Sequence, residues 1–210
     1  MRKIYLMVPV KTLFDENDKI QGRSDSKVSE TAEVPIKEAK DYLRKLGEII
    51  TCVSPQERAI VTAKLCQISQ WRMEDYLTDF DFGVFEAQKN FLLPQVSRTV
   101  PDDYGDFFSS YGYGGESSSA VSERLEKGIK NHIAKLQNKE ADLLYISGKH
   151  AIYSFYLHHR EQDGKLLPAS FFTPASIHTF TYSQGKFNYV ASAVFSQTVP
   201  VVSESEYYSW

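Results

Sequence analysis

The sequence has few cysteines and no long apolar run. Cys52 and Cys66 are the two cysteines among 210 residues, too few for a disulfide framework, so a reducing cytoplasm is the expected location. The apolar N-terminal stretch, residues 4–10, is far shorter than the roughly 18 residues of a membrane span and is followed by no small-residue cleavage site. We therefore expect a buried first strand there, and neither a signal peptide nor a membrane protein.

An excess of one charge is also lacking. Lys and Arg number 24 against 27 Asp and Glu, which gives a net charge of -3 with both signs scattered along the chain. Nucleic-acid-binding domains concentrate basic residues on one face, so a nucleic acid is not an expected partner. The adjacent histidines His158 and His159 have no identifiable further ligands, which favours an exposed helix end. We expect no metal and no cofactor.

Apolar runs alternate with amphipathic helical segments, which is the pattern of crossover units on a mostly parallel sheet. The length suits one domain over residues 1–210, with an aromatic and Gly-rich insertion at about 84–116 that we expect to cover a pocket. Pro35 would disrupt a helix interior, so the first helix is expected to start late or to kink. The expected strands are 3–9, 49–53 and 142–147, a hairpin spans 175–193 around Ser183-Gln184-Gly185, and the expected helices are 36–46, 55–68, 117–137 and 151–159.

One ten-residue block carries a specific resemblance. Ser54-Pro55-Gln56-Glu57-Arg58-Ala59-Ile60-Val61-Thr62-Ala63 is similar to the Ser-Pro-x-x-Arg-Ala-x-x-Thr-Ala block of the histidine phosphatase superfamily, whose members are phosphoglycerate mutase-like. Four further blocks resemble the family in the same order, at residues 6–29, 79–87, 114–124 and 144–152. The resemblance covers about residues 3–195. It implies a three-layer α/β/α sandwich with helices on both faces of a central sheet.

The resemblance also assigns positions to the family's phosphate-handling residues. The nucleophilic histidine falls on Pro9, and the arginine and glycine beside it fall on Val8 and Val10. An asparagine falls on Asp15, and the second histidine falls on Gly148. At the two remaining positions Arg58 is unchanged and Asp79 stands for the acidic residue.

These replacements would remove the family's chemistry. Phosphoryl transfer in this family needs a neutral imidazole as nucleophile and cationic donors around the phosphate oxygens. Proline offers no lone pair for attack and no N–H to donate. We expect a ligand-binding or regulatory pseudoenzyme without phosphatase or mutase activity. Its partner would be a small molecule or peptide in the crevice at the strand carboxyl ends, bound by Arg58, Gln21, Gly22, Tyr113 and Lys149, and a homodimer is compatible with the sequence.

The alternative is a repurposed enzyme that uses the same crevice on a non-phosphate substrate. Its candidate catalytic residues are Arg58, Asp79, His150 and Glu116. His150 would enter the pocket through a shift of the turn that follows Gly148. Against this, Arg58 would be consumed if it formed a buried ion pair with Asp15 or Asp79.

Overall fold

The computed structural model describes residues 1–93, 105–138, 140–161 and 166–195. The turn at 162–164, the C-terminal Tyr207–Trp210 and residues 94–104 of the expected insertion, with Tyr104, lie outside the described residues. The strands are β1 (Arg2–Met7), β2 (Ile49–Val53), β3 (Arg72–Met73), β4 (Asp142–Ile146), β5 (Ile177–Ser183) and β6 (Lys186–Ala193). The α-helices are α1 (Leu13–Glu16), α2 (Glu33–Arg44), α3 (Glu57–Leu65), α4 (Phe107–Ser110), α5 (Ser118–Lys135) and α6 (Lys149–His159).

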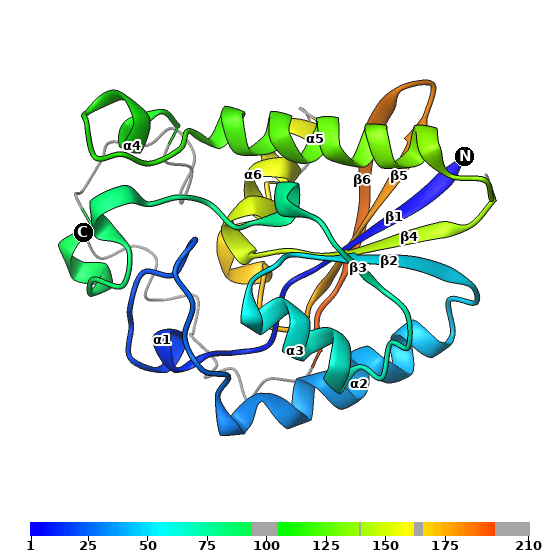
Figure 1. Ribbon diagram of the computed structural model, residues 1–210, viewed down its shortest axis with the longest axis horizontal. Helices are drawn as coiled ribbons and strands as arrows, with labels where there is room; N and C mark the ends of the chain where they lie inside the picture. The colour runs from blue at the N-terminus through cyan, green and yellow to red at the C-terminus, as the bar shows by residue number, and fades with distance from the viewer. Residues whose placement is uncertain (94–104, 139, 162–165, 196–210) are drawn as a thin grey trace.

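The strands form one sheet in the order β3-β2-β4-β1-β5-β6 (Figure 1). The pairs β1–β4, β2–β4 and β2–β3 are parallel, and β5 is antiparallel to both β1 and β6. Alternating side chains of β1 point to opposite faces. Ile4 and Leu6 pack with residues of α5 and α6, whereas Tyr5 and Met7 pack with residues of α2 and α3. This arrangement confirms the expected three-layer α/β fold with a mostly parallel sheet.

Local chemistry explains most of the helix and turn boundaries. The Ser117 hydroxyl accepts the Ala120 N–H at 3.1 Å and caps α5, as this residue type does at a helix start. Helix α2 begins at Glu33, three residues before the expected Ile36, and Pro35 lies in its first turn, where a missing N–H removes no intrahelical hydrogen bond. The β5–β6 hairpin turns on two positive φ angles, 51° at Gln184 and 79° at Gly185, as a type I′ turn requires.

The start of α3 differs from the sequence expectation. Pro55 was expected at its first position, but the helix begins at Glu57 and Gln56 keeps an extended backbone with φ -69° and ψ 138°. The Gln56 side chain donates to the Gly22 carbonyl and accepts the Asp79 N–H. These long-range bonds hold the residue before the helix, and a sequence pattern does not reveal them.

Two features lie at the end of the sheet where β2 begins, at Ile49, and β4 begins, at Asp142. β3 pairs only with Cys52 and Val53, so Ile49–Thr51 of β2 have no strand neighbour on that side within the described sheet. Gly128 in the middle of α5 faces the ring of Tyr76, whose atoms would lie 2.2–2.6 Å from an added Cβ.

Across the described residues, no helix combines the length and apolar character needed to cross a bilayer.

We predict that Gly128→Ala destabilises the protein, although alanine is the better helix former by about 1 kcal/mol. The new methyl group must displace the Tyr76 ring, and such overpacking typically costs about 1–3 kcal/mol. Urea denaturation should show a net loss of about 1 kcal/mol in the free energy of unfolding. The matched control is the same substitution in a Tyr76→Leu background, where it should be neutral or stabilising. A stabilised single variant would contradict the packing argument.

Candidate functional site

The residues expected to line the crevice lie where the carboxyl ends of β1 and β4 meet. Residues 8–10 leave β1 in a fixed path: the Val8 N–H donates to the Ser176 carbonyl at 2.9 Å, and the Val10 N–H donates to the Thr62 hydroxyl at 2.9 Å. Val8 and Val10 are almost fully buried, and Pro9 is buried between them. This part of the site is therefore an alkyl wall.

Arg58 on α3 is 4% exposed and fully occupied at both terminal nitrogens. Nη1 donates to the Asp25 carboxylate at 2.8 Å and to the Ser24 carbonyl at 2.9 Å. Nη2 donates to the Gly22 carbonyl at 2.6 Å and to Asp79 Oδ2 at 3.1 Å. The guanidinium thus holds two carboxylates and a loop, and these two nitrogens point at protein acceptors.

Asp79 is 1% exposed and uses both carboxylate oxygens. Oδ1 accepts the Phe80 and Ala151 N–H groups, each at 2.8 Å, and Oδ2 accepts from Arg58. Ala151 is in the first turn of α6, so the carboxylate lies at the positive end of that helix. Burial raises the Asp79 pKa to about 6 against the opposing effects of Arg58 and the two N–H donors. Asp79 therefore acts as a fixed hydrogen-bond acceptor within the fold, and its pKa lies closer to neutral pH than that of an ordinary aspartate.

Gly148 precedes α6 and lies directly against Asp79. A Cβ built on Gly148 would be 1.9 Å from both Cγ and Oδ2 of Asp79 and 2.3 Å from its Cβ. Real carbon atoms do not approach so closely, so a side chain at residue 148 and the Asp79 carboxylate compete for one volume. Residue 148 therefore has to be glycine as long as the Asp79 carboxylate keeps its position.

The loop at residues 22–24 is closed by Glu86, which the sequence analysis did not single out. The Glu86 carboxylate accepts the N–H groups of Gly22, Arg23 and Ser24 at 2.9–3.2 Å, the Ser24 hydroxyl, and the Phe82 N–H at 3.1 Å. Consecutive backbone N–H groups are a common anion site. Here the anion is the protein's own carboxylate, and the signal for it in the sequence is its place as the last of the three acidic residues in the block at 79–87.

Two candidate acids are engaged away from Arg58. Glu116 pairs with Arg23 at 3.1 Å and with Arg124 of α5 at 2.9 Å. Asp15 is exposed and accepts the Thr12 N–H at 2.7 Å in a capping box at α1. The expected alternative partner of Arg58, Asp15, is therefore not its partner. Asp25 and Asp79 are.

The remaining candidates surround the site without joining this network. His150 packs edge-on against Phe82, with ring centroids 4.9 Å apart, and its pKa is lowered to about 3 by burial and then by Lys149 and Arg58. It is neutral at physiological pH. Lys149 is the first residue of α6 and is partly exposed. Tyr113 packs edge-on against Phe85, with ring centroids 5.1 Å apart.

Gln21 also has a local role. Its side-chain oxygen lies 2.6 Å from the buried Thr12 hydroxyl, which ties the loop to the residue that caps α1. Of the residues expected to bind a ligand, Gln21 and Gly22 therefore contact protein groups, as Arg58 does.

A Ser–His pair beside the alkyl wall is not set up for nucleophilic chemistry. The Ser176 hydroxyl donates to the Thr173 carbonyl at 2.6 Å and lies 2.9 Å from His178 Nε2, so it can only accept from the ring. His178 Nδ1 then accepts from the Ser192 hydroxyl, 2.6 Å away. Burial lowers the His178 pKa to about 3. The proton of Ser176 points away from the imidazole, so the histidine cannot act as its base.

We predict that Gly148→Ala and Asp79→Ala are strongly coupled. Each substitution alone should destabilise the fold. Gly148→Ala does so by its clash with Asp79. Asp79→Ala leaves Arg58 and two N–H groups short of an acceptor, and breaking such a buried ion pair typically costs about 3–5 kcal/mol. The double variant removes the clash, so its loss should fall below the sum by about 1–3 kcal/mol. Denaturant unfolding of all four proteins measures this coupling. Asp25→Ala is the control, since it cannot relieve the clash; equal coupling with Asp25→Ala would refute the shared volume.

We also predict a specific pH dependence for Asp79. Because its pKa is raised from 3.8 to about 6 in the fold, the folded state holds a proton that the unfolded chain releases. This contribution to stability is full below about pH 4 and is lost as the pH rises through about 6. Relative to Asp79→Asn, the wild type should lose on the order of 1–3 kcal/mol between pH 4 and pH 7. A difference that stays flat, or rises with pH, would show that the carboxyl is not perturbed in this direction.

The sequence profile of the histidine phosphatase superfamily (branch 1) matches residues 11–194. Among curated protein sequences there was no significant match. Solved structures with the same fold include a phosphoglycerate mutase from Bacillus anthracis, with 18% identity, a TM-score of 0.70 and coverage of 90% of this chain and 92% of that one.

Two further solved structures are similar over nearly their whole length. A phosphoserine phosphatase from Entamoeba histolytica, in complex with 3-phosphoglyceric acid, shares 17% identity with a TM-score of 0.68, covering 94% of this chain and 98% of that one. A mycobacterial glucosyl-3-phosphoglycerate phosphatase shares 15% identity with a TM-score of 0.69, covering 93% and 98%. At these identities the likeness establishes the fold, and together with the profile match over residues 11–194 it means that this chain belongs to the histidine phosphatase superfamily.

Proposed function

We propose that this chain is a histidine-phosphatase-like protein that does not transfer phosphoryl groups and acts by binding, as a regulatory pseudoenzyme. The feature that supports the proposal is Pro9, which the resemblance assigns to the position of the nucleophile. A proline nitrogen within the chain is an amide without a proton, so it neither attacks phosphorus nor donates a hydrogen bond. The matching profile begins at residue 11, just after this segment.

The charge arrangement supports the same proposal. A phosphate monoester needs free cationic donors, and removal of one preorganised donor typically costs about 10²–10³ in rate. Both terminal nitrogens of Arg58 already hold protein acceptors, and Glu86 holds the backbone N–H groups of residues 22–24. The carboxylates of Asp25, Asp79 and Glu86 would repel an incoming dianion. The guest of this crevice, a small molecule or a peptide, is therefore not a phosphate monoester.

The alternative of a repurposed enzyme draws on one feature, the Asp79 pKa near 6, which suits an acid or base at neutral pH. That role requires a carboxyl oxygen able to reach a substrate. Asp79 is buried with both oxygens bonded, and Arg58 is bonded to it. The binding role therefore accounts for the geometry better than the catalytic one.

We predict that the pure full-length protein hydrolyses p-nitrophenyl phosphate, phosphoserine and 3-phosphoglycerate no faster than buffer, beside an active member of the family as positive control. Pro9→His should be equally inactive, because Arg58 and Asp79 stay bonded to each other. Calorimetric titration with inorganic phosphate should give no heat of binding assignable to Arg58. Saturable hydrolysis by the wild type that Arg58→Lys abolishes would overturn the proposal.

A further inference from the structure

A cavity of about 560 Å³ lies at the end of the sheet opposite the crevice, beneath the C-terminal half of α5. It opens beside the part of β2 that has no strand neighbour. Its walls come from β2, from β3 and the segment after it, and from α5 and the turn that follows. The lining residues are Ile50, Arg72, Glu74, Tyr76, Gly128, Asn131, His132, Lys135, Leu136, Gln137 and Asn138.

Cations gather at this cavity. Arg72 and Lys135 line it, and the Arg2 guanidinium lies beside it, bonded through Nη2 to the Asn138 carbonyl at 3.2 Å. Glu74 is the one acidic residue of the lining. Positive charge therefore exceeds negative charge here, whereas carboxylates dominate the crevice.

His132 stands among these cations and stays neutral. Arg72 Nη2 lies 2.9 Å from His132 Nε2, and since an arginine can only donate, Nε2 accepts. Nδ1 then carries the proton toward the Tyr145 hydroxyl, 2.8 Å away. Burial lowers the His132 pKa to about 4, with further lowering from Arg72, Arg2 and Lys135. The histidine adds no charge and fixes the position of Arg72.

One buried cationic nitrogen at this place has no partner among the described residues: Nη1 of Arg2. Arg2 is 8% exposed, so its free N–H groups are withheld from bulk water. A buried unpaired polar group typically costs about 1–3 kcal/mol, and more when it is charged. Such donors are satisfied when an acceptor, such as a bound oxyanion, enters.

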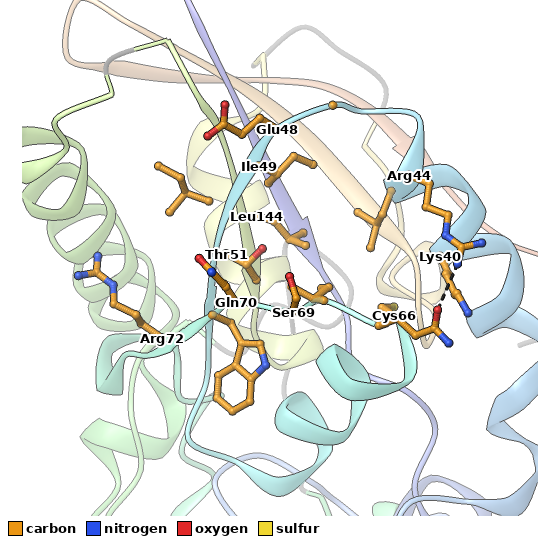
Figure 2. A pocket seen from close by; sticks show the side chains of 16 residues that line it. Lys40, Arg44, Glu48, Ile49, Thr51, Cys66, Ser69, Gln70, Arg72 and Leu144 are labelled. Atoms are coloured by element: carbon orange, nitrogen blue, oxygen red, sulfur yellow. Dashed lines mark hydrogen bonds between the residues drawn. The ribbon is translucent and has the colours of Figure 1, made fainter.

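A larger groove nearby has no such unpaired buried donor among its described lining residues. The groove in Figure 2, of about 970 Å³, lies on the other face of the sheet between the end of α2 and residues 66–72. Its Arg44 is already bonded to the Gln67 amide oxygen at 3.1 Å. None of its described lining residues has a buried polar atom without a partner. Of the two, the smaller cavity is the one beside a buried cationic nitrogen that has no partner among the described residues.

We propose that the cavity beneath α5 binds a small molecule that carries a carboxylate or phosphate group on an apolar body. The anionic group would lie among Arg72, Lys135 and Arg2. The apolar part would contact Ile50, Leu136 and the ring of Tyr76. The volume falls in the range of small-molecule sites, about 300–1,000 Å³. The site is separate from the crevice and does not depend on whether the crevice is catalytic.

The test uses the full chain and three probes of similar shape: benzoate, phenyl phosphate and neutral benzyl alcohol. Amide NMR titration should show saturable shifts at Arg2, His132 and Asn138 with either or both of the anions and none with benzyl alcohol. Which anion binds more tightly identifies the charged group. Shifts confined to Gly22–Ser24 and Gly148, at the crevice, would overturn the proposal, as would equal binding of the neutral probe or an absence of saturable binding.

Two exposed cations supply the variants. Lys135→Glu should weaken the binding of the preferred anion at least about 10-fold, since one charge contact becomes a repulsion. Arg72→Gln should weaken it similarly. Lys127→Glu is the matched control, because it makes the same change on the exposed side of the same helix, outside the cavity. If the Lys127→Glu and Lys135→Glu variants bind the probe with the same affinity, the binding reflects general surface electrostatics and the proposed site is wrong.

Discussion

Burial of the Arg58 guanidinium is the constraint on which the carboxyl end of the sheet depends. An arginine cannot lose its charge in a protein, so acceptors must be brought to it. Asp25 and the carbonyls of Gly22 and Ser24 fix the loop after β1, and Asp79 fixes the segment that leads into residues 80–86. Asp79 in turn caps α6. One charge therefore sets the relative positions of a loop, a buried acid and a helix.

The two ends of the sheet contrast in hydrogen bonding. At the carboxyl end, Gln56 and Glu86 complete a set of donors and acceptors that the protein satisfies from within. At the amino end, Nη1 of Arg2 is buried and has no partner among the described residues. A closed network gives rigidity and favours a guest that makes few polar contacts, whereas an unpaired donor favours a guest that brings an acceptor. The proposed anion site therefore lies at the opposite end of the sheet from the positions that the resemblance assigns to the family's chemistry.

Much of the fold follows from local sequence, and the site does not. The hairpin turn follows from Gly185, because glycine readily adopts the positive φ that the turn requires. Helix α2 begins earlier than Pro35 indicates, at Glu33, because a proline in the first turn gives up no intrahelical hydrogen bond. The partner of Arg58 was narrowed to Asp15 or Asp79. The structure gives Asp79 together with Asp25, whereas Asp15 accepts the Thr12 N–H in the capping box of α1. Contacts between residues far apart in sequence, such as Glu86 with Gly22, leave no periodic signal.

The contact between Asp79 and Gly148 has a consequence for the history of this chain. While the carboxylate occupies its present volume, every side chain at residue 148 is excluded, whatever its chemistry. While Arg58 is buried, Asp79 is needed as its partner. Neither position can change alone without a loss of stability. A side chain at residue 148 is therefore tolerated only together with a change at residue 79 that also gives Arg58 another acceptor.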